Sequence, residues 1–239
     1  MKRIDVRKTF LVLLSAGALA INASGQVTGT YANITIGSGF ADWAGVPVAY
    51  TDEDGVNNPG GVDFQNVYLA NDNNYLYIRF TLQQPADPIS YYNTYIWLDG
   101  DTNPATGYHP FGNPNFGSSL MIIDDQAYQQ TGGGWNEGTL ANADVVYAAD
   151  SLPGTNFEFR IALDVLGVSG ASAGVPLLPG NTIGVQLGTD SLNGDSLPSW
   201  SNYGALAYTL ATVPEPGTLT LVGFGLLMTI GLVRARKSH

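Results

Sequence analysis

The sequence predicts an all-β protein, an antiparallel β-sandwich of the jelly-roll kind, as the body of a 239-residue chain. Three observations predict it. Apolar and polar residues alternate with a period of two through most of the middle of the chain. Clusters of Gly, Pro and Asn separate these runs at short intervals. The one helical signal between the termini is a turn near Asp164 to Gly167. About eight to ten short strands separated by turns fit two packed sheets.

The clearest strand is 75–82 (YLYIRFTL), with aliphatic side chains on one face and Tyr75, Tyr77, Arg79 and Thr81 on the other. It follows a strand at 67–70 across the sequence NDNN at 71–74. These four residues tolerate a left-handed backbone and therefore predict a hairpin turn. The further predicted strands are 95–99, 120–124, 145–148, 157–163 and 183–187.

The N-terminus predicts export. Four Lys and Arg residues within the first eight positions precede an apolar run from Phe10 to Ile21, and small residues follow. This order is that of a secretory signal peptide, and the apolar run is too short to span a bilayer. Cleavage after Ala20 and cleavage after Gly25 both fit. We assign 1–25 to the signal peptide, 26–212 to the β-sandwich domain and 213–239 to a C-terminal sorting segment.

The C-terminal segment opens with Val213-Pro214-Glu215-Pro216-Gly217 and continues from Thr218 to Val233 without a charge. At about 1.5 Å per residue, this run makes a helix of about 24 Å, shorter than the ~30 Å hydrocarbon core of a bilayer. The basic residues after it predict a cytoplasmic C-terminus and a domain outside. The two prolines hold the backbone extended, as a protease or transpeptidase requires of its substrate strand.

Pro214, Glu215, Pro216 and Gly217, followed by a short hydrophobic helix and an Arg-rich end, resemble the PEP-CTERM sorting signal of Gram-negative bacteria. The resemblance covers about the last 27 residues. It implies a precursor anchored in the membrane by the C-terminal transmembrane helix. It also implies processing by an exosortase-type enzyme and release to the cell surface or into an exopolysaccharide matrix.

The charge of the domain restricts its partners. Only two of the nine Lys and Arg residues, Arg79 and Arg160, lie in 26–213, against 18 of the 20 Asp and Glu residues, which gives a net charge of −16. Such a surface repels nucleic acid and anionic membranes and suits divalent cations and neutral ligands. We expect each arginine to pair with a nearby carboxylate such as Glu158, which would reduce repulsion within the sheet.

The residue types present exclude several kinds of site. The chain has no cysteine, so a Cys nucleophile, a thiolate zinc site and a Cys-ligated iron–sulfur cluster are excluded. His109 is the only histidine outside the C-terminal tail, and no nucleophile elbow lies near it, so we predict no Ser-His-Asp triad. The three glutamates of the domain, Glu53, Glu137 and Glu158, show no pairing typical of glycoside hydrolysis.

A weaker resemblance covers about residues 34–190. The order Asp42-Trp43, 75–77, 96–101, 103–108 and 157–161 is similar to the DOMON-like and family-nine-type carbohydrate-binding modules of secreted bacterial proteins. The resemblance implies a β-sandwich that binds sugar, haem or neither. Haem-binding members use an axial Met and His. Met121 and His109 are poorly spaced for this, so no haem is expected.

Aromatic residues on the predicted outer faces are candidates for sugar binding. If the strands at 75–82 and 95–99 lay in one sheet, Tyr77, Arg79, Tyr95 and Trp97 would form a flat platform on which sugar rings stack. The alternative is ordinary packing of the same residues beneath loops, since aromatics are enriched in strands anyway. Trp135, which follows three glycines in a loop, is a further ligand candidate.

Asp99, Asp101 and Asn103 form a candidate calcium site, because their oxygens occupy alternate positions directly after a strand. The first three ligands of a Ca²⁺ loop have this spacing. Pro104 and Pro110 stand where an EF-hand would have its Gly and Glu, so further ligands would come from carbonyls or distant carboxylates. The alternative is a turn in which these side chains cap their own backbone.

These observations favour a non-enzymatic protein of the cell surface or extracellular matrix whose sandwich binds polysaccharide. A structural or adhesive surface protein without a small ligand is the alternative from another class, and a glycan-acting enzyme ranks third. Aromatics open to solvent would favour the first hypothesis, whereas buried aromatics would favour the second.

Overall fold

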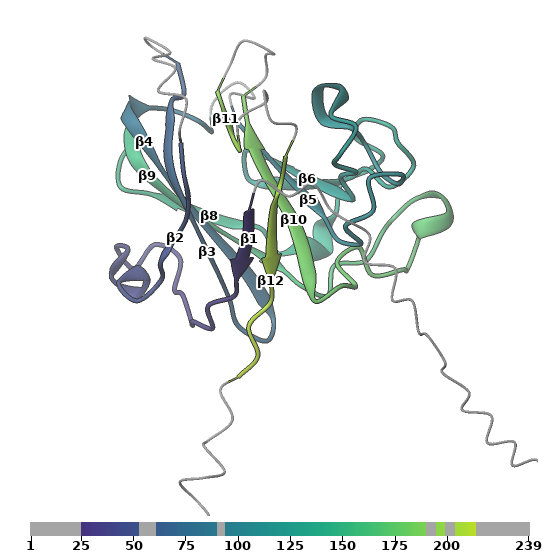
Figure 1. Cartoon of the computed structure of the whole chain (residues 1–239), viewed down its shortest axis with the longest axis horizontal. Helices are drawn as coiled ribbons and strands as arrows, with labels where there is room; N and C mark the ends of the chain where they lie inside the picture. The colour runs from purple at the N-terminus through teal and green to yellow at the C-terminus, as the bar shows by residue number, and fades with distance from the viewer. Residues whose placement is uncertain (1–24, 53–60, 90–93, 190–194, 199–203, 214–239) are drawn as a thin grey trace, which may run out of the picture.

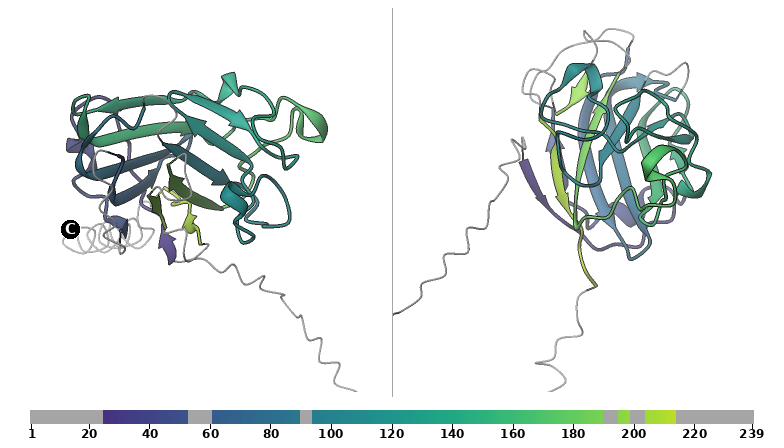
Figure 2. Two further views of the ribbon diagram at one scale, coloured as in Figure 1. Left: turned by 90° about the horizontal axis from the view of Figure 1, so that it is seen from above. Right: turned by 90° about the vertical axis from the view of Figure 1, so that its right-hand side faces the viewer.

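The computed structural model describes residues 25–52, 61–89, 94–189, 195–198 and 204–213. The predicted signal peptide and the sorting residues Pro214, Glu215, Pro216 and Gly217 lie outside them. Two sheets face each other as the layers of a β-sandwich (Figures 1 and 2), which confirms the predicted fold class. Within the described residues, helix is limited to four single 3₁₀ turns, Ala41–Trp43, Pro110–Gly112, Ala141–Ala143 and Gly170–Ser172.

The first sheet has seven strands in the order β1-β12-β10-β5-β6-β7, with the short β11 also paired to β10. All of its pairs are antiparallel except β1 with β12, the first and last strands among the described residues, which run parallel. The strands are β1 Gly25–Thr28, β5 Tyr95–Asp99, β6 Leu120–Ile123, β7 Gln126–Gln129, β10 Thr182–Gly188, β11 Ser196–Leu197 and β12 Leu206–Thr209.

The second sheet has five antiparallel strands in the order β2-β3-β4-β9-β8. They are β2 Val48–Thr51, β3 Phe64–Asn71, β4 Tyr75–Ala86, β8 Val146–Ala149 and β9 Gly154–Ala162. The predicted hairpin at 71–74 joins β3 to β4. Asp72 closes this turn, because its Oδ1 accepts the backbone N–H groups of Asn74 and Tyr75, each at 2.7 Å.

The core lies between the two sheets and uses the predicted apolar faces. Leu76, Ile78, Phe80 and Leu82 of β4 all point into it, each at most 3 % exposed. Phe80 is central, with its ring stacked 5.3 Å from that of Phe157 on the neighbouring strand. The alternation of β4 therefore gives the orientation of the strand correctly.

Several sequence expectations need correction. The described residues contain twelve strands instead of eight to ten. The turn near Asp164 to Gly167 is not helical, since Leu166 and Gly167 each form an isolated β-bridge with a later part of the same connection.

Asn71, at the end of β3, ties the second sheet to both terminal segments. Its Oδ1 accepts the Tyr208 hydroxyl at 2.9 Å and the Ala211 N–H at 2.8 Å, while its Nδ2 donates to the Ala211 carbonyl at 3.0 Å. Its backbone N–H and C=O bond to Thr30 and Ala32, each at 3.0 Å. The side chain is 2 % exposed, so this one amide joins the two sheets where the chain leaves the domain.

Candidate functional site

The outer face of the five-stranded sheet is covered by the segment before β2. Tyr77 points outward from β4, as predicted, but it is 3 % exposed and packs with Ile34, Trp43 and Val46. Its hydroxyl donates to Asp72 Oδ2 at 2.7 Å. Burial and this carboxylate raise the pKa of Tyr77 well above its usual value. Tyr77 is therefore a packing residue, and Trp43, which is 2 % exposed, fills the core of this layer.

Arg79 lies between two aromatic rings instead of pairing with Glu158. Its guanidinium carbon is 5.1 Å from the ring centre of Phe40 and 4.8 Å from that of Tyr68, and Nη2 donates to Asn156 Oδ1 at 2.7 Å. Such cation–π contacts become stronger as the cation loses water. Arg79 thus helps to hold the covering segment on the sheet.

The buried carboxylate of Glu158 holds the same segment. Glu158 is 1 % exposed and accepts the Trp43 Nε1–H at 2.7 Å and the Gly37 N–H at 2.6 Å. Arg160, the other cation of the domain, pairs with Asp144 at 2.9 Å. The expected pairing with a carboxylate is therefore found for Arg160, whereas Glu158, named as an example of the partner, binds Trp43 and Gly37 instead.

The four residues of the predicted platform do not share a sheet. Tyr77 and Arg79 belong to the five-stranded sheet, whereas Tyr95 and Trp97 on β5 belong to the other. The chain crosses from one layer to the other between β4 and β5. Because each pair points away from the core, the two pairs lie on opposite sides of the sandwich, and a single four-residue platform is excluded.

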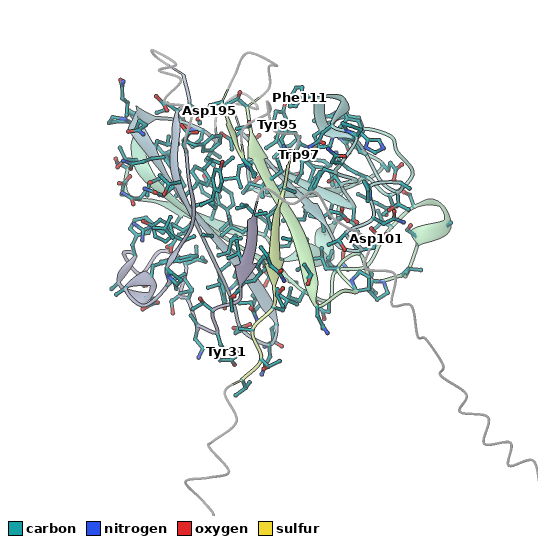
Figure 3. The ribbon with its side chains drawn as sticks, viewed as in Figure 1. Tyr31, Tyr95, Trp97, Asp101, Phe111 and Asp195 are labelled. Atoms are coloured by element: carbon teal, nitrogen blue, oxygen red, sulfur yellow. The ribbon has the colours of Figure 1, made fainter. Side chains whose placement is uncertain are left out.

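Tyr95 and Trp97 form a stacked pair on the outer side of the seven-stranded sheet. Their rings are nearly parallel with centres 5.2 Å apart, and the ring of Phe111 meets Trp97 edge-on at 5.7 Å. Figure 3 labels the three residues in the ribbon. Phe116 and Met121 belong to the same cluster. Trp97 is only 1 % exposed, so its indole supports this surface from below and is not open to a ligand.

Trp135 brings this aromatic cluster to the surface. Its indole is 47 % exposed and meets the rings of Tyr95 and Tyr108 edge-on, each at 5.5 Å. The glycine loop before it is fixed by the Glu137 carboxylate, which accepts the N–H groups of Gly132 at 2.9 Å and Gly134 at 3.2 Å. Trp135 is thus a partly exposed ring on a supported base, the geometry that stacking on a ligand needs.

A pocket of about 280 Å³ opens beside this loop. Its wall contains Asp101 and Gly107 from the loop after β5, Thr131 from the loop that carries Trp135, and a stretch at 172–179 before β10. Gly107 directly precedes Tyr108, the ring that touches Trp135. The pocket wall and the exposed indole are therefore parts of the same two loops.

The Asp99 to Asn103 stretch folds into successive turns in which side chains cap the backbone. Asp99 Oδ1 accepts the Thr102 N–H at 2.8 Å, Asp101 Oδ1 accepts the Asn103 N–H at 2.9 Å, and Asn103 Oδ1 accepts the Ala105 N–H at 3.1 Å. Burial, and then the neighbouring Asp101 carboxyl, raise the pKa of Asp99 to about 7. The turn alternative thus has direct support, while calcium binding stays a prediction.

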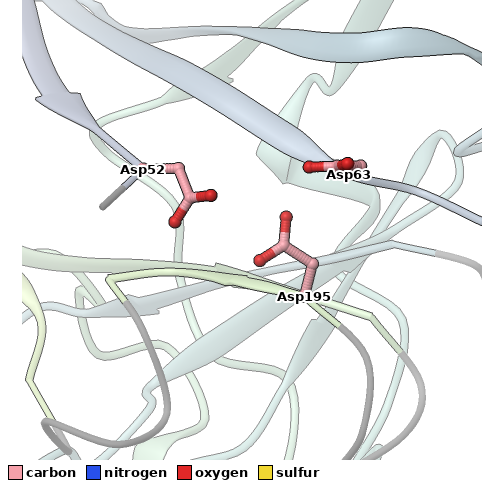
Figure 4. A group of neighbouring side chains, drawn as sticks. All are labelled: Asp52, Asp63 and Asp195. Carbon is pink, nitrogen blue, oxygen red and sulfur yellow. The ribbon is translucent and has the colours of Figure 1, made fainter. Parts of the chain in front are cut away.

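A group of three carboxylates that sequence reasoning missed lies elsewhere. One oxygen each of Asp52, Asp63 and Asp195 falls within 4.8 Å of the others, and the three side chains point toward one another (Figure 4). Asp195 also accepts the N–H groups of Phe64 and Ser196. Burial, and then the charges of Asp52 and Asp63, raise the pKa of Asp195 to about 7. These oxygens are of the kind that hard divalent cations prefer.

The sequence held no signal for this group, because its members come from three separate segments of the chain. His109 is a loop residue, with Nδ1 2.9 Å from each of the carbonyl oxygens of Asn113 and Phe116.

Comparison with family models identifies the kind of signal in the C-terminal segment. Residues 212–237 match the PEP-CTERM protein-sorting motif. The chain carries a PEP-CTERM sorting signal. This motif marks an exported protein that is sorted to the cell surface and processed by an exosortase-type enzyme. In the part of the chain that the structure describes, no helix has the length and apolar character needed to cross a bilayer.

Two solved structures resemble the sandwich. Both are carbohydrate-binding modules of family 9 from Caldicellulosiruptor kristjanssonii. The complex with cellotriose has 15 % identity and a TM-score of 0.46, covering 81 % of this chain and 97 % of that one. The complex with glucose has 14 % identity and a TM-score of 0.45, covering 80 % and 98 %. A search of curated protein sequences found no match. The sugars named in those complexes belong to those modules.

Proposed function

We propose that the protein binds carbohydrate at the bacterial cell surface or in the extracellular matrix, through Trp135 and the adjacent pocket. The observation that carries this proposal is the 47 % exposed indole of Trp135, resting on Tyr95 and Tyr108. Sugars place the apolar faces of their rings on such indoles. The proposed role is binding without catalysis, with an exopolysaccharide as the expected partner.

The support of Trp135 from below favours binding. Ordering a mobile side chain on a ligand costs about 0.5–1.5 kcal/mol. The Glu137 hydrogen bonds and the two aromatic contacts already restrict the loop and the ring in the absence of ligand. Less of the stacking energy is then lost to ordering.

The sorting signal supplies the location. We infer that the precursor is held in the membrane of a Gram-negative bacterium by the segment after Gly217, with the domain outside, until the signal is processed. The net charge of −16 over 26–213 suits a soluble matrix component and disfavours nucleic acid as a partner.

Binding is tested with a glycan array and the purified domain, residues 25–213, which contains both sheets. Trp135→Ala should weaken binding by about 1–3 kcal/mol, because the stacked apolar area is lost. Trp135→Phe should keep part of the affinity. Leu152→Ala is the control, since Leu152 is 53 % exposed on the β8–β9 connection of the other sheet. Equal binding by all three variants would contradict the proposal.

One observation favours the alternative, a structural or adhesive surface protein without a small ligand. Tyr77 and Trp97, both first considered as ligand residues, are at most 3 % exposed and serve packing. If the domain binds no glycan on the array and yet stays at the cell surface after processing, the alternative is favoured.

Calcium at Asp99, Asp101 and Asn103 is a separate proposal. Each carboxylate oxygen has two lone pairs, so the turn hydrogen bonds leave acceptor capacity for an ion. The large negative charge of the domain and the calcium of the extracellular medium favour occupancy. The turns account for this loop without an ion, so the melting experiment described in the Discussion decides between them.

A further inference from the structure

The pocket beside Trp135 has the charge of a cation-binding site. Asp101 is the charged residue in its wall, and the other polar side chains there are the hydroxyls of Thr106, Ser119, Thr131 and Ser172. Glu137 adds a second carboxylate beneath the neighbouring glycine loop, 2.9 Å from the Gly132 nitrogen. No cationic side chain belongs to the wall among the described residues that form it.

The two arginines of the domain do not neutralise this side of the molecule. Both are on strands of the five-stranded sheet, Arg79 held between Phe40 and Tyr68 and Arg160 paired with Asp144. The carboxylate of Asp101 is exposed, accepts the Asn103 N–H at 2.9 Å and bonds to the Thr106 hydroxyl at 3.1 and 3.0 Å. An ionised carboxylate offers about four acceptor sites, so acceptor capacity remains for a ligand.

A protonated amine matches these groups better than a neutral hydroxyl does. An ammonium group has three donors and no acceptor, and the carboxylate and the hydroxyl oxygens of the wall all accept. Charge-assisted hydrogen bonds are about twice as strong as neutral ones. Trp135 adds a π-face at the same loops, and indole is the aromatic ring that attracts cations best.

We propose that this pocket selects a glycan bearing free, protonated amino groups, with Asp101 as the residue that recognises the ammonium. The inference rests on the proposed carbohydrate binding and names its ligand class. The volume, about 280 Å³, lies just below the ~300–1,000 Å³ of ordinary ligand pockets. It suits one amino-sugar ring, with the rest of the glycan along Trp135. Acidic glycans should bind more weakly, because the carboxylate repels them.

The test uses two tetrasaccharides with the same sugar backbone, one with free, charged amino groups and one with neutral N-acetyl groups. Chitotetraose with free amines and its fully N-acetylated form are titrated into the purified domain by calorimetry, in EDTA, at about pH 6, below the ordinary pKa of an amine. The free-amine form should bind about tenfold more tightly at low salt. The difference should shrink at high salt, because exposed charges are screened.

Two matched variants separate recognition from general attraction. Asp101 and Asp150 each accept a hydrogen bond from the hydroxyl of the threonine five residues later, but Asp150 lies in the turn before β9 on the other sheet. Asp101→Asn should lower the affinity for the free-amine form about threefold to tenfold. Asp150→Asn, with the same change in net charge, should leave it nearly unchanged.

The outcomes distinguish the two proposals. Equal losses in the two variants would show that the amine responds only to the overall charge, which overturns recognition by Asp101. Equal affinity for the two tetrasaccharides would also overturn it, while carbohydrate binding itself would stand if Trp135→Ala weakened both. Binding of neither tetrasaccharide, in a domain that binds other glycans on the array, refutes the amino-sugar inference alone. Binding of no glycan refutes the proposed function as well.

Discussion

Replacing Asn71 with alanine removes the side-chain amide that joins the two sheets to the C-terminal exit of the domain. Four hydrogen bonds are lost, with lengths of 2.8–3.0 Å, to Tyr208, to Asp72 and twice to Ala211. A hydrogen bond contributes about 0.5–1.5 kcal/mol net, which gives a range of roughly 2–6 kcal/mol. The loss of stability should fall in the lower half of this range, because Ala211 is only partly buried and its freed backbone groups can bond to water. We expect a loss of about 2–4 kcal/mol.

Urea unfolding of residues 25–213 measures this loss. The midpoint should fall while the slope m stays constant, because the surface exposed on unfolding does not change. Asn73→Ala, in the exposed turn two residues later, is the control and should stay within about 0.5 kcal/mol of the wild type. A result for Asn71→Ala as small as that of the control would refute the account of Asn71 as the link between the sheets.

Four further predictions follow from the same structure. Trp97→Ala should destabilise the domain by about 3–5 kcal/mol, since the indole is 1 % exposed, and a stable variant in thermal melts would show that it is not packed. Protein from the native host should lack the signal peptide and everything beyond about Pro216, so an intact mass that retains 234–239 would count against processing. If calcium binds the folded state, millimolar calcium should raise the melting temperature and Asp101→Ala should abolish that rise, whereas identical melting curves in calcium and EDTA would leave the loop as a turn. In EDTA, the free energy of unfolding should fall as the pH rises from about 4 to 7, because folded Asp195, whose pKa is raised to about 7, keeps a proton that the unfolded chain has released. Asp195→Asn should reduce this pH dependence and leave the part that comes from Asp99, whose pKa is also raised to about 7.

The fold could be predicted because its information is local. The alternation at 75–82 orients β4, and the turn at 71–74 places β3 beside it, so each strand is set by its own residues and near neighbours. Short strands such as β1 and β11 were missed because their burial depends on partners far away in the chain. β1 is a strand because it pairs with β12, about 180 residues later.

The candidate site could be predicted only in part, for the same physical reason. Trp135 was found because an indole after three glycines is unusual in a loop. The prediction of a four-residue platform is wrong because alternation gives the face of each strand but does not say to which sheet the strand belongs. The Asp52, Asp63 and Asp195 group lies in three segments that only the packing of the two sheets brings together. The partners of Arg79 likewise follow from tertiary packing.

The hydrogen bonds between Asn71 and Ala211 also limit the distance between the folded domain and the sorting motif. Ala211 is fixed to the body of the domain, and the Pro-Glu-Pro-Gly sequence begins at residue 214. At about 3.3–3.6 Å per residue, an extended chain reaches no more than about 18 Å from Ala211 to Pro216. If the processing enzyme cuts near Pro216, as predicted, it must act within about 18 Å of the point at which Ala211 is held. We therefore expect the enzyme to contact the surface of the domain around the end of β12 as well as the sorting motif.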